Sequence, residues 1–293
     1  MLKESFLEYL KLEKNYSDKT VLSYGTDLQK FEEYLGGVSK DLDLLSVDAD
    51  LIRDWIVFLM DQGMASTSVN RKLSSLRSFY RYLLRGGYVD VDPMVKIQGP
   101  KKKKPLPVFV KEADMDRLLD EADFGTGFEA VRDRLILEVF YLTGMRRSEL
   151  VGLKDADVDL SSCVVKVTGK RNKQRLIPFA DQLKEEMLAY LSVRNDVCTG
   201  SCEAFFVRKD GKALTAAAVY LLVRRNLAKV VTLKKKSPHV LRHSFATSML
   251  NNKAEIGAVK ELLGHESLMA TEVYTHTTFE ELKKVYEQAH PRA

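Results

Sequence analysis

The segment GPKKKKPLP at residues 99–107 divides this chain of 293 residues into two parts. Its three prolines and its glycine prevent a regular helix, and its four adjacent lysines repel one another into an extended, solvated strap. Residues 99–111 carry five lysines and no acidic residue, whereas residues 1–98 have a net charge of −2 and residues 112–293 one of +2. We therefore predict two domains, at residues 1–98 and 108–293, joined by a basic linker at residues 99–107.

The first part has the apolar periodicity of helices throughout. We predict helices at residues 3–15 and 49–60, a third from an N-cap at Ser17 to Gly36-Gly37, and a fourth from Ser66 to Gly86-Gly87. The fourth helix is expected to have a polar outer face of hydroxyl side chains and arginines, which suits either a DNA groove or plain solvent. The residues of that face are Asn70, Arg71, Ser74, Ser75, Arg77 and Ser78.

The second part combines helices with a small amount of strand. Residues 158–168 and 175–179 alternate or are β-branched, and the turn at residues 169–172 predicts an antiparallel hairpin between them. The fold class predicted is mainly α in two domains, a four-helix domain and an α+β domain with a small antiparallel sheet. The helices expected in the second domain span residues 112–122, 128–142, 181–197, 215–231, 238–251, 254–263 and 279–289.

Composition sets further limits on function. Hydrophobic residues make up 45% of the chain and charged residues 30%, which is ordinary for a soluble globular protein. No apolar run approaches the roughly 20 residues that span a bilayer, and the first residues lack the apolar stretch of a signal peptide. The cysteines Cys163, Cys198 and Cys202 are odd in number, which favours free thiols over a disulfide framework or half a metal site. We expect a cytoplasmic protein with no membrane association.

The histidines lie near the C-terminus and first suggest a metal. His239 and His243 have the i, i+4 spacing of a zinc-binding helix, but the glutamate of the HExxH motif is missing and Arg242 precedes His243. A guanidinium at that place would repel a dication. We therefore predict no metal site.

An anion fits these residues better. Arg146 lies in TGMRRSEL (residues 143–150) and Arg242 in SPHVLRHSFAT (residues 237–247), and a guanidinium can contact two phosphate oxygens at once. Each candidate also has a plain alternative, such as an ion pair of Arg146 with a nearby glutamate. Taken together, the candidates predict a phosphate site. They are Arg146, Lys170 at the hairpin tip, His239 one turn before Arg242, Arg242, His265 after Gly264, and Tyr274.

In this order and spacing, the six residues resemble the complete catalytic set of the tyrosine recombinases of the phage integrase family. The strings TGMRRSEL, TGKRNKQRLIPF, SPHVLRHSFATSML and LLGHESLMATEVYTH carry the resemblance. YSDKTVLSYGTDLQKFEEYL and SVNRKLSSLRSFYRYL resemble the SAM-like, core-binding domain of that family. The departures are Met145, where leucine is more usual, and Arg147 beside the clamp arginine.

The resemblance implies a mechanism without metal or cofactor. Tyr274 would attack a DNA phosphate and form a 3′-phosphotyrosine. Arg146 and Arg242 would hold the non-bridging oxygens, and Lys170 would protonate the leaving 5′-oxygen. His239 would help to move the tyrosine proton. His265 would donate a hydrogen bond to the phosphate, and Glu149 would orient Arg146 or His239.

The resemblance also implies partners. Such enzymes act as tetramers on two double-stranded DNA segments, and the C-terminal helix, with apolar Leu282, Val285 and Tyr286, would dock on a neighbouring subunit. The chain begins directly with the core-binding helices, which resembles the Xer type that resolves chromosome dimers before cell division. A paralogous recombinase and a division-associated DNA translocase are possible partners of that type.

Three other interpretations stay open: an integrase or transposase of a mobile element, a type IB topoisomerase, and a non-catalytic DNA-binding relative. The sequence does not reveal the target site. The residues expected to contact DNA outside the catalytic set are Arg71, Ser74, Arg77, Lys101, Lys102, Lys103, Lys104, Arg171 and Lys173.

Overall fold

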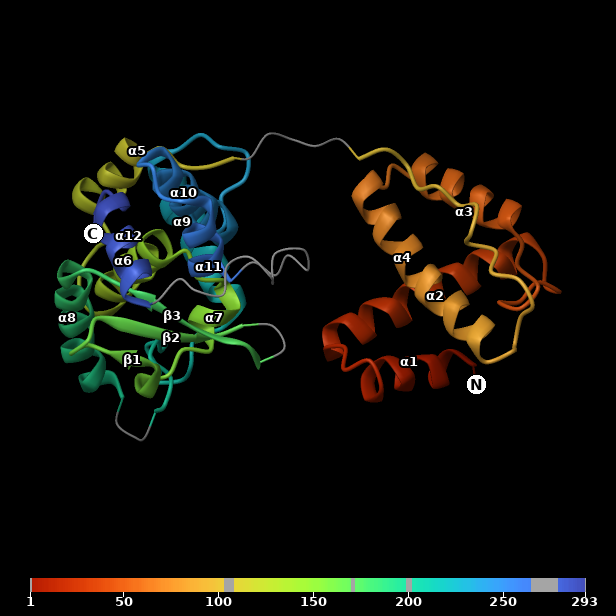
Figure 1. Ribbon diagram of the computed structural model, residues 1–293, viewed down its shortest axis with the longest axis horizontal. Coiled ribbons are helices and arrows are strands. Elements are labelled where there is room, and N and C mark those ends of the chain that lie inside the picture. Colours follow the sequence, from red (N-terminus) through yellow and green to blue (C-terminus); the bar gives the residue numbers. More distant parts are fainter. Residues whose placement is uncertain (1, 103–107, 170–171, 199–201, 265–278, 293) are drawn as a thin grey trace. The chain divides into compact units, whose positions relative to one another are not determined.

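The computed structural model describes residues 2–102, 108–169, 172–198, 202–264 and 279–292 (Figure 1). The chain forms two units, Met1–Pro105 and Leu106–Ala293. Helices predominate in both units, and the mainly α fold with a small antiparallel sheet is confirmed. None of the helices among the described residues has the length and apolar character needed to cross a membrane.

The N-terminal unit is built from four helices around an aromatic core. Phe6, Phe31, Trp55, Phe79 and Tyr80 are fully buried at its centre. The helices are α1 (Leu2–Leu12), α2 (Asp18–Val38), α3 (Ala49–Asp61) and α4 (Ser66–Arg85).

The predicted start of α2 is confirmed, but its predicted end is wrong. The Ser17 side chain caps the helix by accepting a hydrogen bond from the N–H of Thr20. Gly36 and Gly37 do not stop the helix, which continues to Val38. Neither glycine has a positive φ, so the left-handed conformation by which a glycine ends a helix is not formed at either position.

One prediction for α4 is also wrong. Ser75 does not lie on the outer face but is fully buried, and its hydroxyl donates to Asp27 of α2 at 2.8 Å. The buried Lys72 donates to the same carboxylate at 3.0 Å. A buried carboxylate needs such partners, so the polar residues of α4 are divided between solvent and an internal ion network.

The C-terminal unit is organised around α6 (Phe128–Thr143), which is buried along most of its length and packs against α8 (Asp181–Val197) and α10 (Pro238–Asn251). Before α6, α5 (Glu112–Asp116) continues into a π-helical turn, Arg117–Glu121. The other helical elements are α7 (Arg147–Val151), a 3₁₀ turn (Asp155–Asp157), α9 (Ala216–Val230), α11 (Ile256–Leu263) and α12 (Phe279–Ala289).

The sheet has three antiparallel strands, β1 (Val158–Asp159), β2 (Val164–Thr168) and β3 (Gln174–Pro178), in the order β1-β2-β3 (Figure 1). The prediction of one strand over residues 158–168 is wrong because a turn interrupts it. In this turn the Asp159 carboxylate accepts hydrogen bonds from the N–H groups of Ser161 and Ser162.

The C-terminal helix packs on its own unit. Leu282 and Tyr286 of α12 are buried against Phe245, Met249 and Leu262. The apolar residues predicted to contact a neighbouring subunit are therefore occupied within the same chain in this structure.

Candidate active site

Arg146 lies at the start of α7, directly after the turn that follows α6. The chain turns at Gly144, whose φ of +58° suits glycine, and a Cβ there would lie 2.5 Å from Phe245. The Glu149 carboxylate accepts a hydrogen bond from the backbone N–H of Arg146 at 2.7 Å and so caps α7. The turn and the cap together fix the backbone from which the Arg146 guanidinium projects.

Two further contacts hold the Arg146 guanidinium itself. Its Nη1 donates to Glu149 Oε1 at 2.8 Å, and its Nη2 donates to the carbonyl of Gly264 at 2.7 Å. The ion pair with a nearby glutamate, which was the alternative to phosphate binding by Arg146, is thus present. It leaves 33% of the side chain exposed, so the same guanidinium can still meet an anion.

Arg242 reaches the same place from α10. Its Nη1 donates to the carbonyl of Gly144 at 2.6 Å, and its Nη2 donates to the carbonyl of Leu263 at 2.5 Å. Burial, together with the positive charges of Arg146 and Arg175, lowers the pKa of Arg242 to about 10, so the group stays a cation at neutral pH. The structure therefore brings both predicted clamp arginines to one turn and to the C-terminal end of α11.

His239 lies in the first turn of α10, on the same helix as Arg242. Partial desolvation, followed by the charges of Arg147 and Arg242, lowers the pKa of His239 below its ordinary value. A neutral imidazole is therefore favoured at neutral pH, and a neutral imidazole can accept a proton.

Glu149 is the buried anion at the centre of this group. Burial alone would raise its pKa, but hydrogen bonds from Arg175 and from the backbone and side chain of Arg146 lower the pKa to about 2. Of the two partners expected for it, Glu149 contacts Arg146, and neither a hydrogen bond nor an ion pair joins its side chain to His239. Arg175, its second partner, was not singled out in the sequence, although its place on a strand beside the hairpin was a usable signal.

The remaining predicted catalytic residues, Lys170, His265 and Tyr274, lie outside the described residues. The same holds for the predicted DNA contacts Lys103, Lys104 and Arg171.

The residues next to two of these positions are described, and both lie beside Arg146. A Cβ on Gly169, which precedes Lys170, would lie 3.4 Å from Glu149 Oε1 and 3.7 Å from Arg146 Nη1. Gly264, which precedes His265, accepts the hydrogen bond from Arg146 Nη2.

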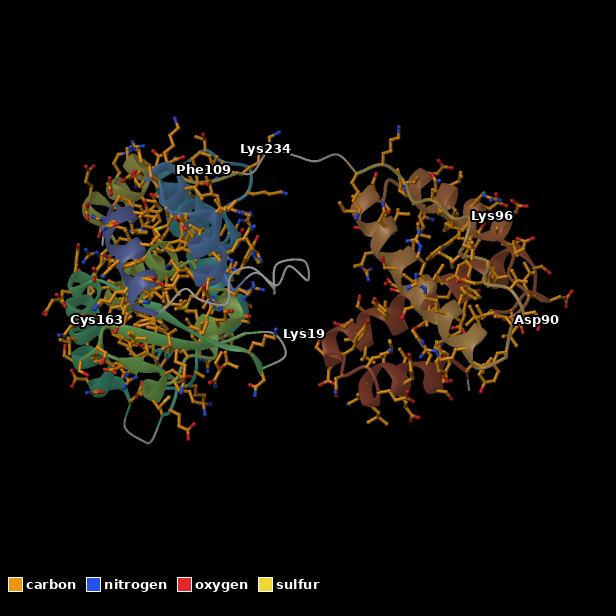
Figure 2. The ribbon with its side chains drawn as sticks, viewed as in Figure 1. Lys19, Asp90, Lys96, Phe109, Cys163 and Lys234 are labelled. Carbon is orange, nitrogen blue, oxygen red and sulfur yellow. The ribbon has the colours of Figure 1, made fainter. Side chains whose placement is uncertain are left out.

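A basic cleft of about 620 Å³ adjoins His239. Among its lining residues are five cations and no acidic residue, and the Arg147 guanidinium lies 5.9 Å from the centre of the Tyr220 ring. Figure 2 labels Lys234 at the surface of this unit. This cleft was not predicted from the sequence, although the run KKKSPH at residues 234–239 was a signal. The cationic residues that line it are Arg147, Arg224, Lys234, Lys235 and Lys236.

A second cleft among the described residues is less suited to phosphate binding than the basic cleft. A cleft of about 830 Å³ beside the start of α6 mixes both charge signs, and its Asp133 already pairs with Arg132 and Arg225.

No group of three His, Cys, Asp or Glu side chains within the described residues is arranged to hold a metal ion. The three cysteines are free thiols.

The predicted DNA contacts of the N-terminal unit differ in their surroundings. Arg71 is half-exposed and pairs with Asp27, and Ser74 is exposed. Arg77 donates to the carbonyl of Ile97 at 2.9 Å. Lys101, Lys102 and, in the other unit, Lys173 are exposed. Their role in DNA binding stays a prediction.

Comparisons with known proteins cover almost the whole chain. Residues 109–281 match the phage integrase family, and residues 4–87 match the phage integrase N-terminal SAM-like domain. Tyrosine recombinase XerC of Staphylococcus carnosus is 40% identical, with 100% of this chain and 98% of that protein covered. XerC of Chlorobaculum tepidum is 37% identical over 98% of this chain and 94% of its own length. XerD of Staphylococcus epidermidis is 36% identical over 99% and 98%.

Solved structures share the fold at lower identity. XerH bound to its difH substrate before cleavage has a TM-score of 0.71 and 23% identity, over 96% of this chain and 83% of that one. The Tn1549 transposon integrase in complex with circular intermediate DNA has a TM-score of 0.73 and 18% identity, over 98% and 99%.

The family predicted from the catalytic strings is confirmed by the matches to both domains and by relatives that align from end to end. The chain belongs to the phage integrase family, in which it is a site-specific tyrosine recombinase of the Xer type.

Proposed function

We propose that this protein cleaves and rejoins double-stranded DNA through a 3′-phosphotyrosyl link at Tyr274. The observation that supports this most is the convergence of Arg146 and Arg242. These two cations come from distant parts of the sequence, and both are fixed by carbonyl groups at the end of α11. Relatives named tyrosine recombinases, and a neighbour of the same fold bound to DNA, support the same assignment.

In the first step the Tyr274 hydroxyl oxygen forms a bond to phosphorus, and the bond from phosphorus to the 5′-oxygen breaks. Neutral His239 accepts the tyrosine proton, and Lys170 donates a proton to the leaving 5′-oxygen. Arg146 and Arg242 stabilise the extra negative charge of the pentavalent state. Rejoining is the reverse attack by a 5′-hydroxyl, so the ester energy is kept and ATP is not required.

The reaction proceeds without a metal ion or other cofactor. The fixed guanidinium groups of Arg146 and Arg242 meet the phosphate charge that a divalent cation would otherwise meet. Cleavage in the presence of EDTA is therefore expected at the full rate, and loss of cleavage under these conditions would contradict this part of the proposal.

The biological role is resolution of chromosome dimers in the cytoplasm, in step with cell division. The end-to-end identity to XerC and XerD relatives supports this role over that of a mobile-element integrase. The assembly is a tetramer on two duplexes, with identical or paralogous subunits and with a DNA translocase as a further partner. Docking of α12 on a neighbour requires Leu282 and Tyr286 to leave their contacts within the chain.

A trapping experiment tests the proposal without knowledge of the target site. Wild-type protein and Tyr274→Phe are incubated with sheared genomic DNA of the source organism, denatured with detergent, and covalently bound DNA is sequenced. We expect wild type to recover one site and Tyr274→Phe to recover none. Covalent DNA on Tyr274→Phe would refute the assignment of the nucleophile.

A second experiment separates recombination from topoisomerase activity. Two duplexes of different length that carry the recovered site are mixed with the protein. Joints between the two duplexes are expected for a recombinase, whereas relaxation of a supercoiled plasmid without such joints indicates a topoisomerase. Mapping the site to the chromosome or to a mobile element decides between the two biological roles.

A further inference from the structure

Arg175 is the second residue of β3 (Gln174–Pro178). Its side chain is only 13% exposed. Nη1 and Nη2 donate to the two oxygens of Glu149, each at 2.9 Å, and Nε donates to the carbonyl of Leu262 at 2.7 Å. All three nitrogens of the guanidinium are thus engaged inside the protein.

These contacts place Arg175 in a row of arginines at the end of α11. The last carbonyls of a helix lack partners within the helix and carry partial negative charge, so cations stabilise them. Here three successive carbonyls each accept a hydrogen bond from a different arginine. The pairs are Leu262 with Arg175, Leu263 with Arg242, and Gly264 with Arg146.

We propose that Arg175 is a positioning residue that holds the Arg146 guanidinium and the end of α11 in register for cleavage. It acts through Glu149, whose carboxylate joins Arg175 to both the backbone and the side chain of Arg146. It also fixes the last turn of α11, which leads directly to His265. This inference rests on the proposed function and adds a residue outside the predicted catalytic set.

The geometry requires an arginine. A lysine has one nitrogen and cannot span both oxygens of Glu149 and the Leu262 carbonyl at once. The Arg175 guanidinium in turn favours a glycine at position 264, because a Cβ on Gly264 would lie 3.0 Å from Arg175 Nη1. Loss of the fork frees Glu149 to move Arg146, and a misplacement of about 1 Å at a reacting group can lower a rate by about 100-fold.

The test uses the full chain and a nicked duplex that carries the site recovered from genomic DNA. The rate constant for covalent complex formation is measured under single-turnover conditions for Arg175→Lys and Arg175→Gln. We expect the rate constant to fall by about 10- to 100-fold. DNA affinity is expected to stay unchanged, because the Arg175 guanidinium is engaged within the protein. A merely structural role would lower the fraction of active protein, and so the amplitude, without changing the rate constant.

A double-mutant comparison shows whether Arg175 acts through Arg146. When Arg146 is already replaced by lysine, Arg175→Lys is expected to lower the rate further by less than about threefold. Arg117→Lys serves as the matched control, because Arg117 is exposed in the turn after α5 and pairs with Asp114, away from Glu149 and Arg146. This control is expected to keep the wild-type rate.

Two results would overturn the inference: Arg175→Lys with a rate constant close to that of wild type, or penalties that multiply in the double variant. Both results leave the proposed function intact, because wild type still forms the covalent complex in these assays. Absence of that complex with wild type refutes the proposed function and this inference with it.

Discussion

The Glu149 carboxylate lies between two arginines, almost excluded from solvent, and this environment makes the stability of the C-terminal unit depend on acid. Its pKa falls from 4.5 to about 2 on folding. A lowered pKa means that the stabilisation is complete above about pH 4.5 and is lost as pH falls toward about 2. The difference between the two pKa values corresponds to about 3 kcal/mol.

Glu149→Gln tests this dependence. The variant keeps the shape of the side chain but lacks the charge, so it is expected to be less stable than wild type at neutral pH. The gap in free energy of unfolding should shrink as pH falls through the window between the two pKa values. Urea unfolding followed by circular dichroism at several pH values measures the gap. A gap that stays constant on acidification would show that the Glu149 charge does not contribute.

Arg147 and His239 give a second prediction at the level of single residues. Positive charge near His239 lowers its pKa, and Arg147 is the foremost charged contributor. Replacement of Arg147 by glutamine is expected to raise the pKa of His239 and to move the acid limb of the cleavage profile to higher pH. Single-turnover cleavage across a pH series checks this. Arg208→Gln is the control, because Arg208 pairs with Asp210 and is not among the charges that lower the pKa of His239. An acid limb that moves to lower pH would contradict the role of neutral His239.

At the scale of elements, the boundaries of helices could be predicted best where a local signal in the sequence marks them. Ser17 and Gly86 act within one turn of chain, and both lie at helix ends as expected. Gly36 did not end α2 because neither Gly36 nor Gly37 adopts the left-handed conformation that ends a helix, and the sequence does not show which glycines will do so. The prediction of one strand over residues 158–168 failed because the side-chain pattern did not indicate the turn in which Asp159 accepts two backbone hydrogen bonds.

The junction of α6 and α7 gives the prediction at this scale. Gly144→Ala combines a left-handed backbone with a Cβ that would lie 2.5 Å from Phe245. Strain and overpacking together are expected to destabilise the C-terminal unit by about 3 kcal/mol. Gly125→Ala is the matched control, because Gly125 also has a positive φ but open space around it, and it should cost only about 1 kcal/mol. Equal losses in urea unfolding would mean that the contact with Phe245 does not matter.

At the scale of the whole molecule, the sequence predicted chemistry better than geometry. The types and order of Arg146, His239 and Arg242 were enough to predict a phosphate site. That Arg175 reaches Glu149 and Leu262 depends on how β3, α7 and α11 pack, which no local pattern records. The basic cleft beside His239 likewise forms only when the loop after α9 meets α7.

Two separate runs of lysine are candidates for contact with the DNA backbone, and their relative importance for DNA binding can be measured. One run is the linker, Lys101 to Lys104, and the other is Lys234 to Lys236 at the basic cleft. Each lysine that contacts a phosphate releases a counterion, so the slope of log affinity against log salt changes by about 0.9 for each contact. The salt slope therefore gives the number of lysine–phosphate contacts, which the affinity at a single salt concentration does not.

Replacement of the four linker lysines by glutamine is expected to reduce the salt slope by up to about 3.6, and replacement of the three cleft lysines by up to about 2.7. The loss should be similar for cognate and random duplexes, because phosphate contacts carry no sequence information. Lys209→Gln with Lys212→Gln, on an exposed loop, is the control and should leave the slope unchanged. If the linker variant keeps the wild-type slope while the cleft variant lowers it, the linker is a solvated spacer and the cleft beside His239 carries the basic contact with the DNA backbone.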